Sequence, residues 1–288
     1  MSTSSVNWKD VPSGATRGTF LAPSGPLATF EAGCPGDPPV CLIPGITGSK
    51  EDFSLVIPHL ARAGYRVIAV DLAGQYESSS AGPHSGAGWT LPMHVADIRA
   101  VLEYLGKAHV VGYSYGGLVC EHLIADEPAL LRSATLIGTP PLSGNALRGF
   151  RVVGPIVKWA SPAVAARVML SGLRFNINRV DKERHAFVLH RMGYTVKESV
   201  TSAMADMLAI PDLEDALRHS GVPLLVGAGH GDMWPLEQFA AFSQRIGAEF
   251  REYNAGHSPS EQSPDELAAD LMEFFDRVDR PLSTFASL

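Results

Sequence analysis

Ser114 lies at the centre of a Gly-x-Ser-x-Gly pattern that runs from Gly112 to Gly116. An apolar run containing Val110 precedes the pattern, and an apolar helical segment follows from Leu118. In a tight turn between a strand and a helix, a serine hydroxyl is exposed above the sheet. Glycines two residues away on either side avoid a collision across such a turn. The pattern therefore predicts that Ser114 is a nucleophile held in strained backbone geometry.

A serine hydroxyl needs a general base within hydrogen-bond reach, and the base is usually a histidine oriented by a carboxylate. His257 directly follows a strand predicted at 249–253, and Asp232 lies in the loop after a strand predicted at 222–226. The carboxyl ends of parallel strands meet at one edge of a sheet, where the nucleophile also lies. We therefore expect His257 to be the base and Asp232 to be the acid that orients it.

Two structural alternatives exist for these residues. His257 could be a polar loop residue, and Asp232 could cap the helix predicted to follow from Pro235. The preceding strand ends with Ile137-Gly138-Thr139 and offers no carboxylate, so Asp232 has no competitor there. His230 lies close to Asp232 but precedes the acid, whereas the base is expected after the last strand.

Acyl transfer also needs two hydrogen-bond donors for the oxyanion. The backbone N–H of Tyr115 opens the helix after the nucleophile, where the helix dipole favours negative charge. The backbone N–H of Ile46, in the Gly45–Gly48 loop, is the second candidate because this loop follows the first strand predicted to be parallel. The Ile46 assignment depends on the position of the loop alone.

The elements that must position these residues alternate along the chain. An antiparallel hairpin is predicted at 19–22 and 27–31. Further strands are predicted at 39–43, 65–70, 134–137, 222–226 and 249–253, besides the strand that leads into Ser114. Helices predicted after Ser49 and Thr90, within 118–123 and 235–246, and after Ser263 separate them. Apolar strands alternating with helices predict an α/β fold, with a mostly parallel sheet and helices on both faces.

The alternation breaks once. Residues 140–209 contain only helical fragments between glycines and prolines, which predicts a helical lid over the carboxyl ends of the strands. The core would then consist of residues 1–139, with a loose leader at 1–17, and residues 210–288.

The predicted lid is basic. Between Leu142 and Ser199 ten basic residues stand against three acidic ones, which gives +7 in a chain of −7 and leaves −14 elsewhere. One interpretation is a solvated face of amphipathic helices. The other is that the lid steers an anionic substrate or an acidic acyl-carrier partner.

Composition excludes several classes. The chain has 288 residues and 45% hydrophobic residues, enough for one large domain. Its net charge of −7 argues against a nucleic-acid binder. No signal peptide or apolar run of membrane-spanning length is visible.

The three cysteines, without a CxxC pair, are expected to be reduced thiols in a cytoplasmic protein. Without a P-loop, a dinucleotide fingerprint or a metal-ligand cluster, no cofactor is expected. The sequence leaves the oligomeric state open.

From about residue 18 onward the chain resembles the α/β-hydrolase superfamily, specifically its lidded, esterase-like serine hydrolases. The resemblance is carried by five segments, which are Pro44–Ser49, Asp71–Gln75, Gly112–Gly117, Gly229–Asp232 and Gly256–His257. It implies a Ser114–Asp232–His257 triad and hydrolysis of a carboxylic ester or related small acyl compound through an acyl-serine intermediate. Three positions depart from the family pattern: Pro44 replaces a usual histidine, Pro235 arrives one residue early, and Tyr76-Glu77 replaces small residues.

Other chemistries of the superfamily remain open. The related haloalkane dehalogenases and epoxide hydrolases use an aspartate nucleophile, so Ser114 argues against both. The same triad serves carbon–carbon bond hydrolases, cofactor-free haloperoxidases and hydroxynitrile lyases. A ligand receptor that retains the triad is the alternative outside enzymes.

Overall fold

The computed structural model describes residues 7–83, 88–149, 161–175 and 180–280. Within these residues eight strands form one sheet. The strands are β1 (Ala15–Ala22), β2 (Gly25–Ala32), β3 (Pro39–Ile43), β4 (Arg66–Val70), β5 (Ala108–Tyr113), β6 (Leu131–Ile137), β7 (Leu224–Gly229) and β8 (Glu249–Tyr253).

The sheet is antiparallel at one edge and parallel across the rest. Its order is β1-β2-β4-β3-β5-β6-β7-β8, and β2 pairs antiparallel with both β1 and β4. All other neighbours pair in parallel. The predicted hairpin and the predicted mostly parallel sheet are both confirmed.

Helices connect the strands. The α-helices are α1 (Ile57–Arg62), α2 (Leu91–Leu105), α3 (Tyr115–Asp126), α5 (Pro162–Arg174), α6 (Lys182–Met192), α7 (Lys197–Met207), α8 (Glu214–His219), α9 (Leu236–Ile246), α10 (Pro259–Gln262) and α11 (Pro264–Asp279). Short 3₁₀ helices are η1 (Lys50–Phe53), η2 (Tyr76–Ser78), η3 (Pro128–Leu130) and η4 (Ala146–Gly149).

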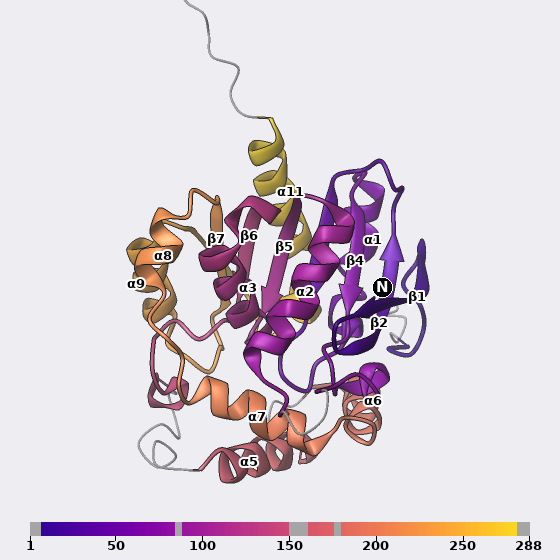
Figure 1. Cartoon of the computed structure of the whole chain (residues 1–288), viewed down its shortest axis with the longest axis vertical. Coiled ribbons are helices and arrows are strands. Elements are labelled where there is room, and N and C mark those ends of the chain that lie inside the picture. The colour runs from indigo at the N-terminus through magenta and orange to yellow at the C-terminus, as the bar shows by residue number, and fades with distance from the viewer. Residues whose placement is uncertain (1–6, 84–87, 150–160, 176–179, 281–288) are drawn as a thin grey trace, which may run out of the picture.

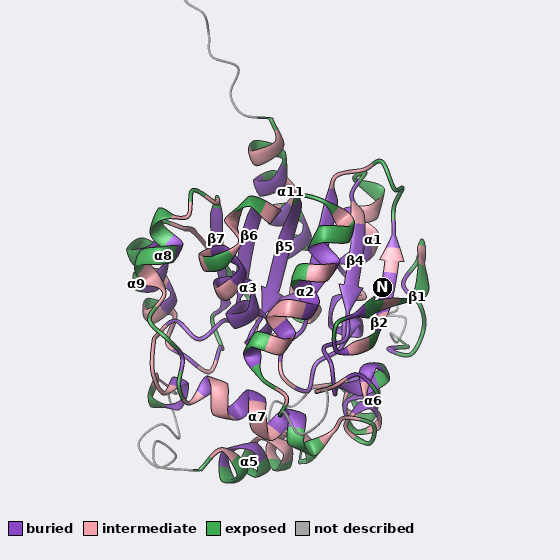
Figure 2. Cartoon of the chain, in the orientation of Figure 1, coloured by how far each residue is buried: buried purple, intermediate pink, exposed green. Residues whose placement is uncertain are grey.

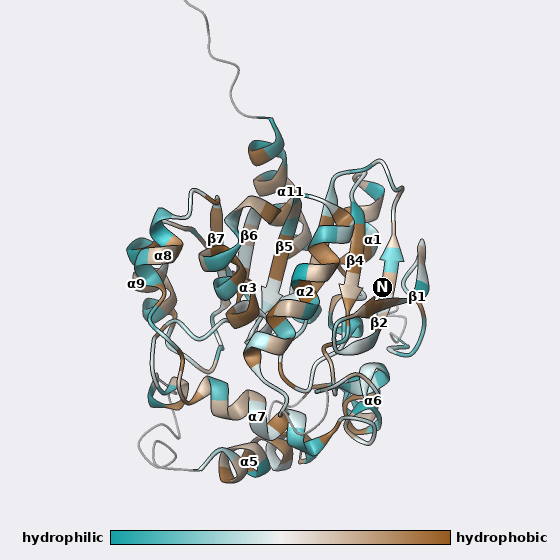
Figure 3. Cartoon of the chain, viewed as in Figure 1, coloured by the Kyte–Doolittle hydropathy of each residue, from teal (hydrophilic) through white to brown (hydrophobic). Residues whose placement is uncertain are grey.

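Both faces of the sheet are covered. In β3, Cys41 belongs to a core cluster that includes residues of α2, α3 and α9, whereas its neighbour Leu42 belongs to a cluster that includes residues of α1 and α11. Successive side chains of a strand point to opposite faces, so an apolar strand supplies both cores. The central strands are accordingly buried in Figure 2 and mostly apolar in Figure 3.

The helix predicted after Ser49 is divided into η1 and α1. Pro58 lies in the first turn of α1. A continuous helix through this position would lack one N–H donor, and the proline ring would clash with the carbonyl of Ser54 four residues earlier. By contrast, the predicted Thr90 cap is confirmed, since its side chain accepts the N–H of Met93 at the start of α2.

The expected loose leader at 1–17 is wrong at its carboxyl end. Strand β1 already begins at Ala15, and Trp8 is buried in a cluster with Tyr76 and Phe187. Trp8 has polar neighbours in the sequence, so no periodicity indicated that it packs. Residues 1–6 lie outside the described part of the chain.

Residues 140–209, which we call the helical insertion, contain η4, α5, α6 and α7. An isolated bridge closes its base, with paired backbone hydrogen bonds of 2.7 and 2.9 Å between Gly144 and Ile210. Figure 1 shows α5, α6 and α7 beyond the arrowheads of the parallel strands, where the nucleophile is expected. Residues 150–160 and 176–179 of the insertion are outside the described part of the chain.

Candidate active site

Ser114 lies between the end of β5 and the start of α3, in the turn that the sequence predicted. Its backbone angles are φ 53° and ψ −116°, a region that residues with a side chain rarely adopt. Its N–H donates to the carbonyl of Ile137 at 2.8 Å. A β-carbon added at Gly112 would lie 2.5 Å from the carbonyl oxygen of Gly116. The turn therefore excludes larger residues at this position.

The three predicted side chains form one hydrogen-bonded chain. His257 Nε2 lies 3.1 Å from Ser114 Oγ. On the other side of the ring, Nδ1 lies 3.1 Å from both carboxylate oxygens of Asp232. The Asp232 side chain is fully buried, while the imidazole is 15% exposed. The residues come from the ends of β5, β7 and β8, so the carboxyl edge of the sheet brings them together.

Three residues that sequence reasoning did not identify enclose the imidazole. The rings of Tyr113 and Trp234 lie 5.2 and 5.8 Å from the His257 ring, centroid to centroid. Gly138 has φ 54°, and a β-carbon there would lie 3.1 Å from Nδ1 of His257. Gly138 directly follows β6, and Trp234 lies in the loop after β7, two residues beyond Asp232. Their positions after these strands were the only feature of the sequence that could have indicated a place near His257.

The two aromatic residues also fix neighbouring loops. The Tyr113 hydroxyl lies 2.8 Å from the Oγ atom of Ser258, the residue that follows His257. Burial raises the pKa of Tyr113 well above its ordinary value, so the phenol is neutral. Trp234 Nε1 donates to the carbonyl of Ala146 at 2.9 Å, which links the acid loop to the helical insertion.

The loop from Gly45 to Gly48 passes directly beside Ser114. Gly48 N–H donates to the Gly45 carbonyl at 2.9 Å, and Thr47 has φ 59°. A β-carbon added at Gly45 would lie 3.0 Å from Ser114 Cβ. The loop that the sequence suggested for Ile46 therefore lies beside Ser114, and the Ile46 N–H remains a proposed oxyanion donor together with that of Tyr115.

The side chain of Tyr115 ties this region to the insertion. Its hydroxyl donates to Asp206 of α7 at 2.9 Å and lies 3.1 Å from His94 Nδ1. Burial, and to a lesser degree Asp206, raises the pKa of the phenol. Burial lowers the pKa of His94 to about 4, so the imidazole is neutral near pH 7. The residue after Ser114 is thus held by both α2 and α7.

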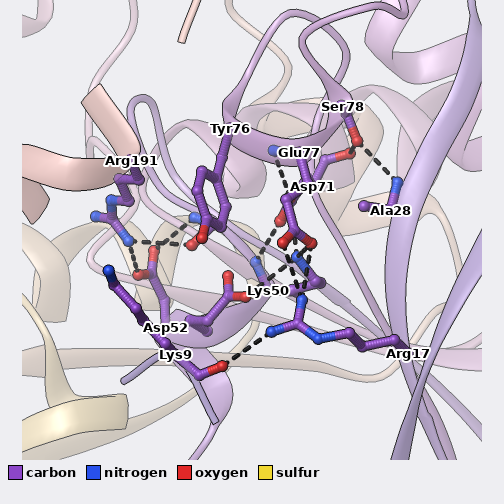
Figure 4. A network of polar contacts seen from close by, with 12 residues as sticks. Lys9, Arg17, Ala28, Lys50, Asp52, Asp71, Tyr76, Glu77, Ser78 and Arg191 are labelled. Atoms are coloured by element: carbon purple, nitrogen blue, oxygen red, sulfur yellow. Dashed lines mark hydrogen bonds and ion pairs between the residues drawn. The ribbon is translucent and has the colours of Figure 1, made fainter. Parts of the chain in front are cut away.

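Glu77 of the unusual Tyr76-Glu77 pair belongs to a partly buried ion cluster (Figure 4). Lys50 Nζ lies 2.7 Å from Glu77 and 3.1 Å from Asp71. Arg17 on β1 donates to Glu77 at 2.9 Å. Glu77 therefore joins the first strand to the segment that follows the Gly45–Gly48 loop.

No group of histidine, cysteine or acidic side chains suited to a metal ion occurs among the described residues. Within the same part of the chain, the helices are too short or too polar to cross a membrane.

A family model described as alpha/beta hydrolase fold matches residues 38–219. This chain belongs to that family. The matched range includes Ser114 and the loop with Ile46, and Asp232 and His257 follow it.

The individual relatives share only a quarter to a third of their aligned residues with this chain, or fewer. Bifunctional epoxide hydrolase 2 of Sus scrofa is 32% identical over 137 residues, which are 46% of this chain and 24% of the relative. The chain thus spans less than half of that relative's length. Pyrrolizixenacetamide deacetylase of Xenorhabdus hominickii is 25% identical over 259 residues, 85% of this chain and 93% of that protein. A solved structure described among carboxylesterases of Nitrososphaera gargenis superposes with a TM-score of 0.73 at 22% identity, covering 91% and 99% of the two chains.

Proposed function

We propose that this protein hydrolyses carboxylic esters or related acyl compounds through an acyl-serine intermediate on Ser114. The observation that carries the proposal is the continuous chain of contacts from Asp232 through His257 to Ser114, each of 3.1 Å. A serine with a positioned imidazole and carboxylate is the arrangement that activates a hydroxyl for attack on a carbonyl carbon.

In the first half-reaction, Ser114 Oγ attacks the carbonyl carbon while its proton moves to His257 Nε2. Asp232 accepts a hydrogen bond from Nδ1–H and stabilises the imidazolium that forms. The tetrahedral intermediate collapses, and His257 gives the proton to the leaving alcohol oxygen. In the second half-reaction, water attacks the acyl-serine in the same way, and Ser114 is released with the acid product.

The negative charge of the tetrahedral intermediate would be held by the N–H groups of Ile46 and Tyr115. Two observations support this. The loop with Ile46 lies against the nucleophile, and Tyr115 is the first residue of α3. A helix start carries unpaired N–H groups and a favourable dipole for an anion.

The helical insertion would act as a lid and define the substrate pocket. Relatives named as a deacetylase and as carboxylesterases support an acyl substrate. We further propose that the acyl substrate is anionic or bound to an acidic carrier, because the insertion is basic. Exposed basic side chains that would steer it include Arg167, Arg174, Lys182 and Lys197.

A panel of aryl esters of graded acyl length tests the proposal. We expect the wild-type protein to give sustained turnover of many equivalents, and Ser114→Ala to give none. A single stoichiometric burst without further turnover would contradict ester hydrolysis and favour a receptor that retains the triad. Absence of any reaction across the panel would also contradict it.

A further inference from the structure

Asp52 of η1 contacts the loop beside the nucleophile. Its Oδ2 atom accepts the N–H of Ser49 at 3.2 Å, directly after the Gly45–Gly48 loop. A β-carbon added at Gly48 would lie 2.5 Å from the same oxygen, so carboxylate and loop are packed closely. One half of the carboxylate therefore holds the carboxyl end of the loop that carries Ile46.

The other half of the Asp52 carboxylate binds the helical insertion. Its Oδ1 atom accepts Arg184 Nη2 of α6 at 2.6 Å, and Arg191 of the same helix makes a short contact with that oxygen. Arg191 also donates to Ser49 Oγ at 3.2 Å. Figure 4 shows the Arg191 side chain extending from α6 to Asp52.

Arg184 has a second carboxylate partner, in α10. Its Nε donates to Glu261 Oε2 at 2.9 Å. Helix α10 begins two residues after His257, and the next side chain, Gln262, accepts the N–H of Gly256 at 2.5 Å. Arg184 therefore joins the loop of the proposed oxyanion donor to the loop of the proposed base.

These four charges are buried and balanced. No side chain among Asp52, Arg184, Arg191 and Glu261 is more than 10% exposed. Burial alone would raise the pKa of Asp52, but the Arg191 and Arg184 guanidiniums bring it below its ordinary value. The Arg184 guanidinium also lies 4.3 Å from the centre of the Trp8 ring. Removal of one partner would leave an uncompensated buried charge, which is strongly destabilising.

We propose that Asp52, Arg184, Arg191 and Glu261 form an ionic clamp through which α6 sets the relative position of the two loops that carry Ile46 and His257. The clamp residues are positioning residues and do not touch the substrate. The expected change in kcat rests on the proposed function. The expected effect of the clamp on the two loops does not depend on that function.

The test compares Arg184→Met and Arg184→Lys with Arg132→Gln as a control. Arg132 is the second residue of β6, so it lies at the amino end of the strand, away from Ser114, and it binds Asp279 at 2.7 Å. Hydrogen exchange by mass spectrometry reports on the loops, and steady-state kinetics on an aryl ester reports on the site. Thermal unfolding shows that each variant is folded.

With Arg184→Met, we expect faster exchange in peptides covering residues 45–52 and 256–262, with β5 unchanged. Because small displacements of reacting groups cost up to about 100-fold in rate, kcat should fall about 10- to 100-fold while KM changes by less than about 3-fold. Arg184→Lys should recover part of the rate, since it keeps the charge but not the fork that reaches both carboxylates. Arg132→Gln should lower Tm alone.

Adding Glu261→Gln to Arg184→Met removes the unpaired buried carboxylate. We expect Tm to recover and kcat to stay low, which a purely structural role for Arg184 would not produce. Unchanged exchange in both loops together with a wild-type kcat in Arg184→Met would overturn the clamp. If the wild-type protein turns over no ester, the proposed function fails, and the exchange experiment still decides the clamp.

Discussion

The edge of the sheet and the helical insertion hold their polar side chains by different means. At the sheet edge, Ser114 and His257 are placed by turns at strand ends, where glycines allow close backbone approach. In the insertion, Arg184 and Arg191 are held by Asp52, which lies 132 and 139 residues away in the sequence. Local backbone geometry fixes the first group, and long-range ion pairs fix the second.

This difference limits how many basic side chains of the insertion are free to attract an anionic substrate. Two of its arginines are buried in ion pairs, so they are not available to attract a substrate. The neutral cluster that they form with Asp52 and Glu261 instead connects the two loops beside Ser114. We therefore expect changes at the sheet edge to remove activity, and changes in the insertion to reduce it.

The largest effect should come from the triad. His257→Ala or Asp232→Asn should lower kcat about 10⁴-fold with little change in the far-ultraviolet circular dichroism, because the proton acceptor or its orientation is lost. His230→Ala is the matched control, since His230 lies two residues before Asp232 but points to Glu252 at 3.3 Å. An equal loss of kcat in His230→Ala and in the triad variants would contradict a special role for His257 and Asp232.

Next in size is a change to the turn itself. A β-carbon in Gly116→Ala would lie 2.5 Å from the carbonyl oxygen of Ile43, so the variant should lose about 1–3 kcal/mol of unfolding free energy. Urea unfolding measures this loss. Gly36→Ala should be neutral, because nothing lies within 4 Å of its added carbon. Wild-type stability of Gly116→Ala would show that the turn tolerates a side chain.

A buried acid in the core contrasts with the paired charges of the insertion. Glu121 is buried in α3, and its Oε1 has no hydrogen-bond partner among the described residues. Burial raises its pKa to about 8 from an ordinary 4.5. The folded state thus retains a proton that the unfolded chain releases, and the free energy of unfolding falls as pH rises from about 4.5 to about 8.

Glu121→Gln should remove this decline, which is at most about 1.4 kcal/mol per pH unit. Urea unfolding at pH 5 and pH 8 measures it for both proteins. The same decline in the variant and the wild type would assign the pH dependence to other groups.

The smallest effect concerns the exposed basic residues of the insertion. If they steer an anionic ester, kcat/KM for that ester should fall about 2- to 5-fold when the ionic strength rises from about 0.02 M to 0.5 M, because salt screens exposed charges. A neutral ester of the same length should show no change. Equal salt dependence for both esters would remove the support for steering.

The sequence predicted the parts of the molecule whose cause is local. Gly112 and Gly116 identify the turn because only glycine fits there, and the apolar runs identify the parallel strands. Asp232 and His257 follow from their places after β7 and β8. The partners of Arg184 were not predictable, since the pairing of one arginine with Asp52 and Glu261 depends on how α6 packs. Trp8 was missed for the same reason.

The role of Ser114 as the nucleophile is tested by the site at which a fluorophosphonate modifies the protein, read by intact-protein and peptide mass spectrometry. We predict one adduct per chain, located on Ser114, and no adduct in Ser114→Ala. An adduct on another residue, or unchanged labelling of the Ser114→Ala protein, would contradict Ser114 as the nucleophile.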